Sequence, residues 1–441
     1  MTRVILVGAG SMGRAWLTAI AQSPSVQLAG IVDLDLGAAR ATGYDVPVGT
    51  DVVELARATG AEAVINVTVP AAHHSVTTAA LFAGLPVLGE KPVADTVAQA
   101  MSLAAASEVT GKLFMVSQSR RWNPQLFRLK ETVAQLGAIG TVTTSFFRAP
   151  HFGGFREVMP YPLLVDMAIH PFDSVRFLLD AEPVSVFCES YNPSWSWFAG
   201  DAAATAVFEM STGARYVYTG SWCSPGPESS WNGSWRISGA RGTAFWDGDN
   251  QPLPPETLLP ETLPPDTSSP SSAPPSSAPP GSGSPSSVPP NFTPPGGAQP
   301  DFGPPRSGSR GSAPPNAVSR PNPSPHTRSP HFTSPHFASP HVFSSPDLSG
   351  LSGIEGALAV FVDALQTGVT PMGEVHENLM SLAMVEAAIA SSRAHAPVRL
   401  ADVLDRAYAA ALRDETDPQV RAALTAWPSA NGRTPGVELE E

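Results

Sequence analysis

The chain has 441 residues and a formal net charge of −13 at pH 7, and it contains no basic run. Nucleic acid is therefore not a predicted partner, because clustered lysines and arginines bind the phosphate backbone. The two cysteines, Cys188 and Cys223, fit a reducing compartment. No apolar run reaches membrane-spanning length, and the first strand pattern begins by Val4, which leaves no room for a signal peptide. We expect a soluble, cytoplasmic protein without membrane contact.

Strand and helix patterns alternate from the N-terminus to residue 118. The apolar runs, typical of buried parallel strands, are Val4–Val7, Val26–Val32, Ala63–Val69, Pro86–Leu88 and Leu113–Val116. Alanine-rich helical stretches lie between them at 11–22, 51–59, 71–83 and 95–110. This alternation predicts an α/β fold in which residues 1–118 form a doubly wound parallel sheet, the Rossmann dinucleotide-binding domain.

The first strand runs directly into Gly8-x-Gly10-x-x-Gly13 and a helix. Gly8 permits a tight turn, Gly10 lets a pyrophosphate approach the backbone, and Gly13 lets the helix lie close to the strand. Ser11 and Met12 fall in the first helical turn, whose free N–H groups attract phosphates. These five residues are predicted to bind the cofactor.

Asp33 ends the second apolar run, twenty residues after Gly13. A carboxylate at this place binds the adenosine ribose hydroxyls and repels a 2′-phosphate. Leu34 and Asp35 offer no cation to a phosphate, although Arg40 is close enough in the chain to fold back. We predict NAD as the cofactor in preference to NADP.

The chain changes character after residue 118. Helical patterns occur at 123–136 and 163–179. The segments with strand patterns are Thr141–Arg148, Val184–Tyr191, Ala203–Met210, Arg215–Trp222, Ser234–Ser238 and Thr243–Trp246. They predict an α+β domain built on a large, mostly antiparallel open sheet.

Regular patterns resume with helices at 354–366 and 374–392 and a short strand at 397–400. We assign residues 119–251 and 351–400 together to a substrate-binding and oligomerisation domain. Residues 401–441 are expected to add one or two amphipathic helices and an acidic end.

Residues 252–350 interrupt this second domain. The window 251–350 holds 28 of the 47 prolines, together with serine, glycine and threonine. Proline removes a backbone donor and fixes φ, and too little apolar surface is present to offset the entropy of ordering. We predict a long disordered insertion. Its histidines at every fifth position (326, 331, 336 and 341) can bind a metal weakly, but a tandem-repeat expansion explains them, and no metal site is predicted.

Two groups of residues can carry chemistry. Glu90 and Lys91 follow a strand of the first domain, at the edge where Pro70 and the glycine loop also lie. Asp166 and His170 are four residues apart, so on a helix they share one face. Histidine is the usual proton carrier near neutral pH, and a neighbouring carboxylate can orient it.

Arginines and aromatics in the second half admit two interpretations each. Arg120 and Arg121 either hold an anionic substrate or form surface ion pairs. Several tryptophans can stack on sugar C–H groups, but in an antiparallel sheet they more often belong to the core or to a subunit interface.

These motifs, taken in order, resemble the Gfo/Idh/MocA oxidoreductase family. The resemblance rests on Gly8–Gly13, Val69-Pro70-Ala-Ala-His73-His74, Glu90-Lys91-Pro92, Arg121-Trp-Asn-Pro124, Asp166-x-x-x-His170 and Glu377–Ala388. It implies that Lys91, Asp166 and His170 are catalytic. It also implies that Pro70, His74, Glu90 and Lys91 lie against the cofactor. The insertion and the 401–441 extension depart from the family pattern.

The resemblance implies an NAD(P)-dependent dehydrogenase or reductase. Its substrate would be a sugar, a cyclitol or a related polyhydroxy compound, and its sheet would favour a homodimer or homotetramer. Three alternatives remain open at this point: a non-catalytic, nucleotide-sensing regulator of the same fold, an NAD-dependent glycoside hydrolase, and an interaction scaffold built around the insertion.

Overall fold

The computed structural model describes residues 1–253 and 350–427. The predicted insertion and its histidine repeat fall almost wholly at 254–349, and the acidic end at 428–441; both lie outside the described residues. No helix of the described ranges is long and apolar enough to cross a membrane.

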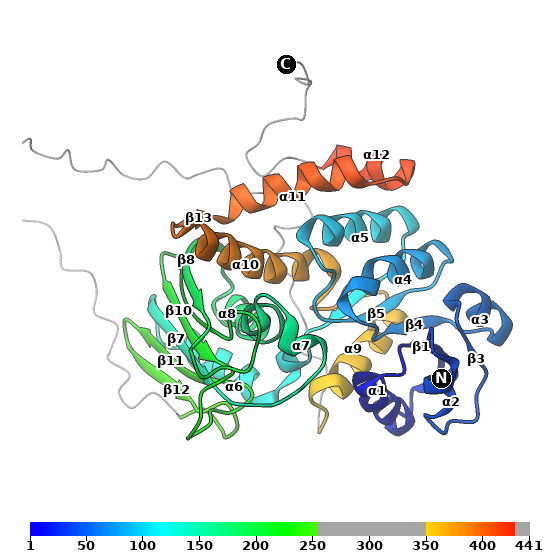
Figure 1. The fold of residues 1–441 in the computed structure, drawn as a ribbon, viewed down its shortest axis with the longest axis horizontal. Helices are drawn as coiled ribbons and strands as arrows, with labels where there is room; N and C mark the ends of the chain where they lie inside the picture. The colour runs from blue at the N-terminus through cyan, green and yellow to red at the C-terminus, as the bar shows by residue number, and fades with distance from the viewer. Residues whose placement is uncertain (254–349, 428–441) are drawn as a thin grey trace, which may run out of the picture. The chain divides into compact units, whose positions relative to one another are not determined.

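The N-terminal half is a six-stranded, all-parallel sheet in the order β3-β2-β1-β4-β5-β6 (Figure 1). Its strands are β1 (Thr2–Val7), β2 (Val26–Val32), β3 (Val48–Gly49), β4 (Ala63–Asn66), β5 (Val87–Glu90) and β6 (Phe114–Ser117). Its helices are α1 (Ser11–Gln22), α2 (Leu36–Arg40), α3 (Val52–Thr59), α4 (Pro70–Phe82) and α5 (Val97–Thr110). The doubly wound Rossmann prediction is confirmed.

Strand order reverses between β1 and β4. Ligands of such sheets bind outside the carboxyl ends of the strands at this switch point. The turns after β1, β2 and β5 therefore open onto one edge of the sheet. The sequence prediction missed α2 and β3, because neither is long enough to show a period.

The second sheet has seven strands in the order β12-β11-β7-β10-β9-β8-β13. These are β7 (Ile139–Phe147), β8 (Pro183–Tyr191), β9 (Ala203–Met210), β10 (Arg215–Ser221), β11 (Ser234–Gly239), β12 (Gly242–Trp246) and β13 (Val398–Arg399). Only β7 and β10 pair in parallel, so the prediction of a mostly antiparallel sheet is confirmed.

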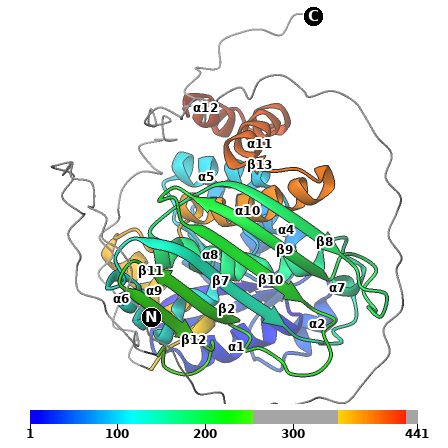
Figure 2. The same cartoon turned by 90° about the vertical axis from the view of Figure 1, so that its left-hand side faces the viewer.

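Helices cover one face of this sheet. They include α6 (Pro124–Ala134), α8 (Ile169–Leu179) and α10 (Val375–Ala394). The ring of Phe172 on α8 contacts Phe208, Tyr216 and Tyr218 at centroid distances of 4.9, 6.2 and 5.4 Å. The opposite face, turned to the viewer in Figure 2, carries no described helix.

Three helices near the C-terminal end join this core to the first sheet. Helix α9 (Gly353–Thr367) packs against α1 and the 3₁₀ turn η1 (Ser119–Trp122), and its apolar residues share a hydrophobic cluster with β1. Helices α11 (Leu400–Asp414) and α12 (Pro418–Ala426) pack on α5 (Figure 1).

Candidate active site

The turn between β1 and α1 has the close packing that the glycine pattern predicts. Gly8 has φ +105°, and a Cβ on Gly13 would lie 2.0 Å from the carbonyl oxygen of Gly8. A Cβ on Gly10 would meet nothing within 4 Å. The first and third glycines are therefore required by the fold, and the second leaves open space beside the backbone.

The N-terminus of α1 is free to meet an anion. Gly10 is its N-cap and supplies no side-chain hydrogen bond, and the first turn holds no acidic residue. Ser11 and Met12 are exposed in that turn. Unsatisfied N–H groups and the positive end of the helix dipole suit a pyrophosphate. These features fit a dinucleotide.

Asp33 is held in place by the backbone at the end of β2. Its Oδ2 accepts a hydrogen bond from Ala9 N at 2.7 Å, and its Oδ1 accepts one from Asp35 N at 2.8 Å. The neighbouring Leu34 is 91% exposed and carries no charge. A carboxylate fixed beside the glycine turn suits ribose hydroxyls and disfavours a 2′-phosphate.

Lys91 and Asp166 meet across the two halves of the described chain. Lys91 follows β5, and its Nζ donates to Asp166 Oδ1 at 2.6 Å and to the Asp166 carbonyl oxygen at 2.8 Å. Asp166 lies in a single π-helical segment, η2 (Leu163–Ala168), and such segments often occur at functional sites. Its other oxygen accepts from Arg156 Nε at 2.7 Å. Burial alone would raise the pKa of Asp166, but the charges of Lys91 and Arg156 lower it.

Glu90 ends β5 and stabilises the backbone at Lys91. It is buried, and it accepts hydrogen bonds from Trp16 Nε1 at 2.8 Å and from Lys91 N at 3.1 Å. Burial raises the pKa of its carboxyl. These hydrogen bonds fix the backbone of Lys91, and the contact of Glu90 with the cofactor remains a prediction.

His170 is the second residue of α8, one turn beyond Asp166. It is buried, and its Nδ1 has no hydrogen-bond partner in the described part of the chain. Burial, followed by the charges of Arg120 and Lys91, holds the pKa of His170 well below its usual value. The imidazole is therefore neutral at physiological pH, and its Nδ1 is available to a hydrogen-bonding partner.

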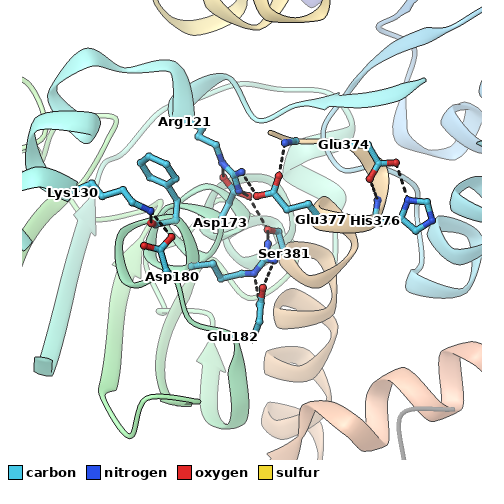
Figure 3. Close-up of polar contacts among 12 residues, drawn as sticks. Arg121, Lys130, Asp173, Asp180, Glu182, Glu374, His376, Glu377 and Ser381 are labelled. Carbon is cyan, nitrogen blue, oxygen red and sulfur yellow. Dashed lines mark hydrogen bonds and ion pairs between the residues drawn. The ribbon is translucent and has the colours of Figure 1, made fainter. Parts of the chain in front are cut away.

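Arg121 is committed to a buried ion-pair network (Figure 3). Its Nε and Nη2 donate to the two carboxylate oxygens of Asp173, at 2.9 and 2.5 Å, and its Nη1 pairs with Glu377. Burial alone would lower the pKa of Arg121, but these two carboxylates raise it. Because Asp173 is on α8 and Glu377 is on α10, the network fixes η1 against both helices.

The two histidines of α4 point to different partners. His73 is buried and contacts the carbonyl oxygens of Pro92 (Nδ1, 2.7 Å) and Thr68 (Nε2, 3.0 Å). The Nε2 of His74 instead contacts Ser102 Oγ on α5 at 3.1 Å. Since Pro92 follows Lys91, His73 is the histidine of this pair that contacts the Lys91 loop. The expected position of His74 against the cofactor remains a prediction.

Two residues of this site were missed by the sequence prediction. Arg156 lies on α7 (Phe155–Val158), a short helix in a glycine- and proline-rich stretch that carries no motif. His73 stood within the motif Val69–His74, but no role was predicted for it. The sequence did carry a signal for His73. Pro70 is typical of a first helical position, so α4 begins directly after β4 and its first turn, with His73, lies near β5.

The parallel sheet, the glycine turn and the fixed carboxylate of Asp33 define a dinucleotide-binding protein. Two family models match the chain: one described as an oxidoreductase family with an NAD-binding Rossmann fold, over residues 2–118, and the GFO/IDH/MocA C-terminal domain, over residues 128–245. Together they cover just over half of the chain. The chain belongs to the Gfo/Idh/MocA family of NAD-dependent dehydrogenases and reductases, as the sequence predicted.

Named relatives agree with this assignment. Inositol 2-dehydrogenase 1 of Saccharopolyspora erythraea is 32% identical over 195 residues, which are 42% of this chain and 56% of that protein. The rhizopine catabolism protein MocA of Rhizobium meliloti is 27% identical over 263 residues, 56% of this chain and 80% of that protein. This chain thus spans little over half of the inositol dehydrogenase.

A solved structure has a similar fold. An oxidoreductase from Agrobacterium radiobacter, crystallised with NAD⁺, L-tartaric acid and magnesium, matches with a TM-score of 0.65 and 17% identity. The match covers 91% of this chain and 99% of that one.

Proposed function

We propose that the protein transfers a hydride between NAD and a secondary alcohol or carbonyl of a sugar, a cyclitol or a related polyhydroxy compound. The observation that carries the proposal is the 2.6 Å contact between Lys91 Nζ of the Rossmann half and Asp166 Oδ1 of the second half, with His170 one turn away. The relatives named inositol 2-dehydrogenase and 1,5-anhydro-D-fructose reductase support this class of substrate.

Gly8, Gly10, Gly13 and the N-terminus of α1 would hold the pyrophosphate, and Asp33 the adenosine ribose. The bound nicotinamide supplies a hydride acceptor or donor. The domain proposed at residues 119–251 and 351–400 would supply most contacts to the substrate.

Oxidising a carbinol also requires that its hydroxyl proton leave, so a base must stand at that oxygen. We assign this role to His170, because its imidazole is neutral and its Nδ1 lacks a partner in residues 1–253 and 350–427. Lys91 would donate a hydrogen bond to the same oxygen. Asp166 would position Lys91 through the 2.6 Å ion pair, with Arg156 steadying the other carboxylate oxygen.

The test is a panel of polyols, cyclitols and sugars with NAD, followed by NADH absorbance. Oxidation of at least one compound, with NAD preferred over NADP, is the expected result. Two alternatives give different results. A nucleotide-sensing regulator would bind NAD stoichiometrically without turning over any compound. An NAD-dependent glycoside hydrolase would retain bound nucleotide and release sugar without net NADH.

We further propose a homodimer or tetramer formed through the bare face of the seven-stranded sheet. One row of paired residues crosses that face: Phe245, Arg236, Thr143, Val217, Val207 and Phe187. Phe187, Val207 and Phe245 are 45%, 38% and 40% exposed. Replacing Val207 by Asp is expected to give monomers in light scattering, and an unchanged mass contradicts the assignment.

We also propose that the protein is cytoplasmic. The two free, buried cysteines suit that compartment.

A further inference from the structure

Residues 91–96 connect β5 to α5 and carry Lys91. The far end of this loop is anchored by Glu386 on α10, whose Oε1 accepts a hydrogen bond from Val97 N at 2.7 Å. Pro92, directly after Lys91, has no N–H group. Its carbonyl oxygen is therefore the one backbone group through which a hydrogen bond can hold it.

The carbonyl oxygen of Pro92 is held by His73. This histidine is 2% exposed. Its Nδ1 lies 2.7 Å from the Pro92 oxygen, and its Nε2 lies 3.0 Å from the carbonyl oxygen of Thr68. No backbone N–H of residues 1–253 and 350–427 donates to the Pro92 oxygen. The contact with His73 is thus what fixes the chain directly after Lys91.

The two carbonyl oxygens beside His73 can only accept hydrogen bonds, but a neutral imidazole has a single N–H. Burial lowers the pKa of His73, although the two carbonyl contacts raise it, so the ring is neutral at physiological pH. The hydrogen belongs on Nδ1, because the contact of Nδ1 with Pro92 is the shorter one. The N–H therefore serves the Lys91 loop, and the contact of Nε2 with Thr68 is not a hydrogen bond.

The backbone that carries this imidazole is itself fixed by Asn66, the buried last residue of β4. Its Nδ2 donates to Thr77 Oγ1 at 3.0 Å and to the carbonyl oxygen of His73 at 3.3 Å. Its Oδ1 accepts from Thr68 Oγ1 at 2.7 Å. These bonds join the first turn of α4 to the end of β4, so His73 can hold the neighbouring loop without moving itself.

We propose that His73 is a positioning residue, which sets the place of Lys91 Nζ against Asp166 and against the substrate carbinol through the Pro92 carbonyl. A displacement of about 1 Å near a reacting group can slow a reaction about a hundredfold. The effect on turnover rests on the proposed function. The hold on the Lys91 loop does not, so the two can fail separately.

Two substitutions separate the hydrogen bond from the bulk of the ring. The amide nitrogen of His73→Asn takes the place of Nδ1 and can donate to Pro92, whereas that of His73→Gln takes the place of Nε2 and faces Thr68. Hydride transfer is measured in single turnovers with the compound that the unmodified protein oxidises fastest in the polyol panel. His73→Gln should slow this step about tenfold to a hundredfold with unchanged NADH affinity, and His73→Asn should retain most of the rate. The control His395→Asn replaces an exposed histidine at the C-cap of α10 and should change nothing.

A second measurement needs no substrate. The lysines of the chain are Lys91, Lys112 and Lys130, so NMR of protein labelled at lysine Cε gives few signals, and Lys91→Arg identifies that of Lys91. The chemical shift of Lys91 Cε reports its 2.6 Å ion pair with Asp166. This signal should move in His73→Gln and stay in place in His73→Asn. Nitrogen NMR of labelled histidine in the unmodified protein should show His73 protonated at Nδ1, whatever the variants do to folding.

Equal effects of His73→Asn and His73→Gln, a Lys91 signal that is unchanged in His73→Gln, or a hydrogen on Nε2 in the unmodified protein overturns the inference. A Lys91 signal that moves in His73→Gln alone, in a protein that oxidises no compound, upholds the inference and contradicts the dehydrogenase. Polyol oxidation at the same rate in the unmodified protein and in His73→Gln does the reverse.

Discussion

Replacing Arg121 by Met tests how the site is held together. The change leaves Asp173 and Glu377 facing each other without the guanidinium that pairs with both. The side chains of Arg121 and Asp173 are 1% and 2% exposed, so water cannot reach the orphaned charge without local unfolding. Breaking a buried ion pair from one side costs about 3–5 kcal/mol. At about 2–4 °C per kcal/mol, the melting temperature should fall by about 10 °C.

Lys130→Met is the matched control, and both pairs are drawn in Figure 3. Its partner Asp180 is 77% exposed and returns to water when the lysine is lost, so the expected cost is about 1 kcal/mol or less. Urea unfolding of both variants, followed by circular dichroism, measures the difference. Arg121→Lys, which keeps one charge but not the two-point contact, should fall between them. Equal losses in Arg121→Met and Lys130→Met would refute the burial argument.

Two further predictions concern pH and cofactor choice. His376 lies between Glu108 and Glu374; burial opposes its protonation, but the two carboxylates raise its pKa to about 9. Because the folded-state pKa lies above the ordinary value near 6.5, this stabilisation is complete below about pH 6.5 and is lost as pH rises through about 9, a change of about 3 kcal/mol. Unfolding free energies measured from pH 6 to 10 should show it, and His376→Gln should remove it; an identical pH slope in that variant contradicts the assignment. Asp33→Ser removes the carboxylate held by Ala9 N and Asp35 N, so NADH affinity should fall about tenfold while that for NADPH rises. Fluorescence titration with both nucleotides checks this, and an unchanged NADH to NADPH ratio would count against the role of Asp33.

The nucleotide half was predictable because its signals are local. Gly8, Gly10 and Gly13 are fixed by a backbone turn, and the strands are buried on both faces and therefore read as continuous apolar runs. The strands of the second sheet were equally predictable. One face of this sheet packs on α8 and the other faces outward, so apolar and polar residues alternate along each strand.

What the sequence did not reveal depends on tertiary contacts. Arg120 and Arg121 are adjacent and chemically identical. Arg121 forms ion pairs with Asp173 and Glu377, which lie far along the chain, whereas Arg120 forms no ion pair within the described residues. His73 and His74 differ only by a rotation of about 100° along a helix, which follows from 3.6 residues per turn. Arg156 contacts Asp166 from a segment whose sequence shows no helical or strand-like hydrophobic period.

The most direct test is the rate of hydride transfer in single-turnover experiments, once a substrate is in hand. Lys91→Met and His170→Asn should each slow this step by about a hundredfold to ten-thousandfold, the usual contribution of a positioned proton-transfer group, while NADH binds as in the unmodified protein. Near-normal transfer in both variants would show that the two side chains do not meet over the reacting carbon.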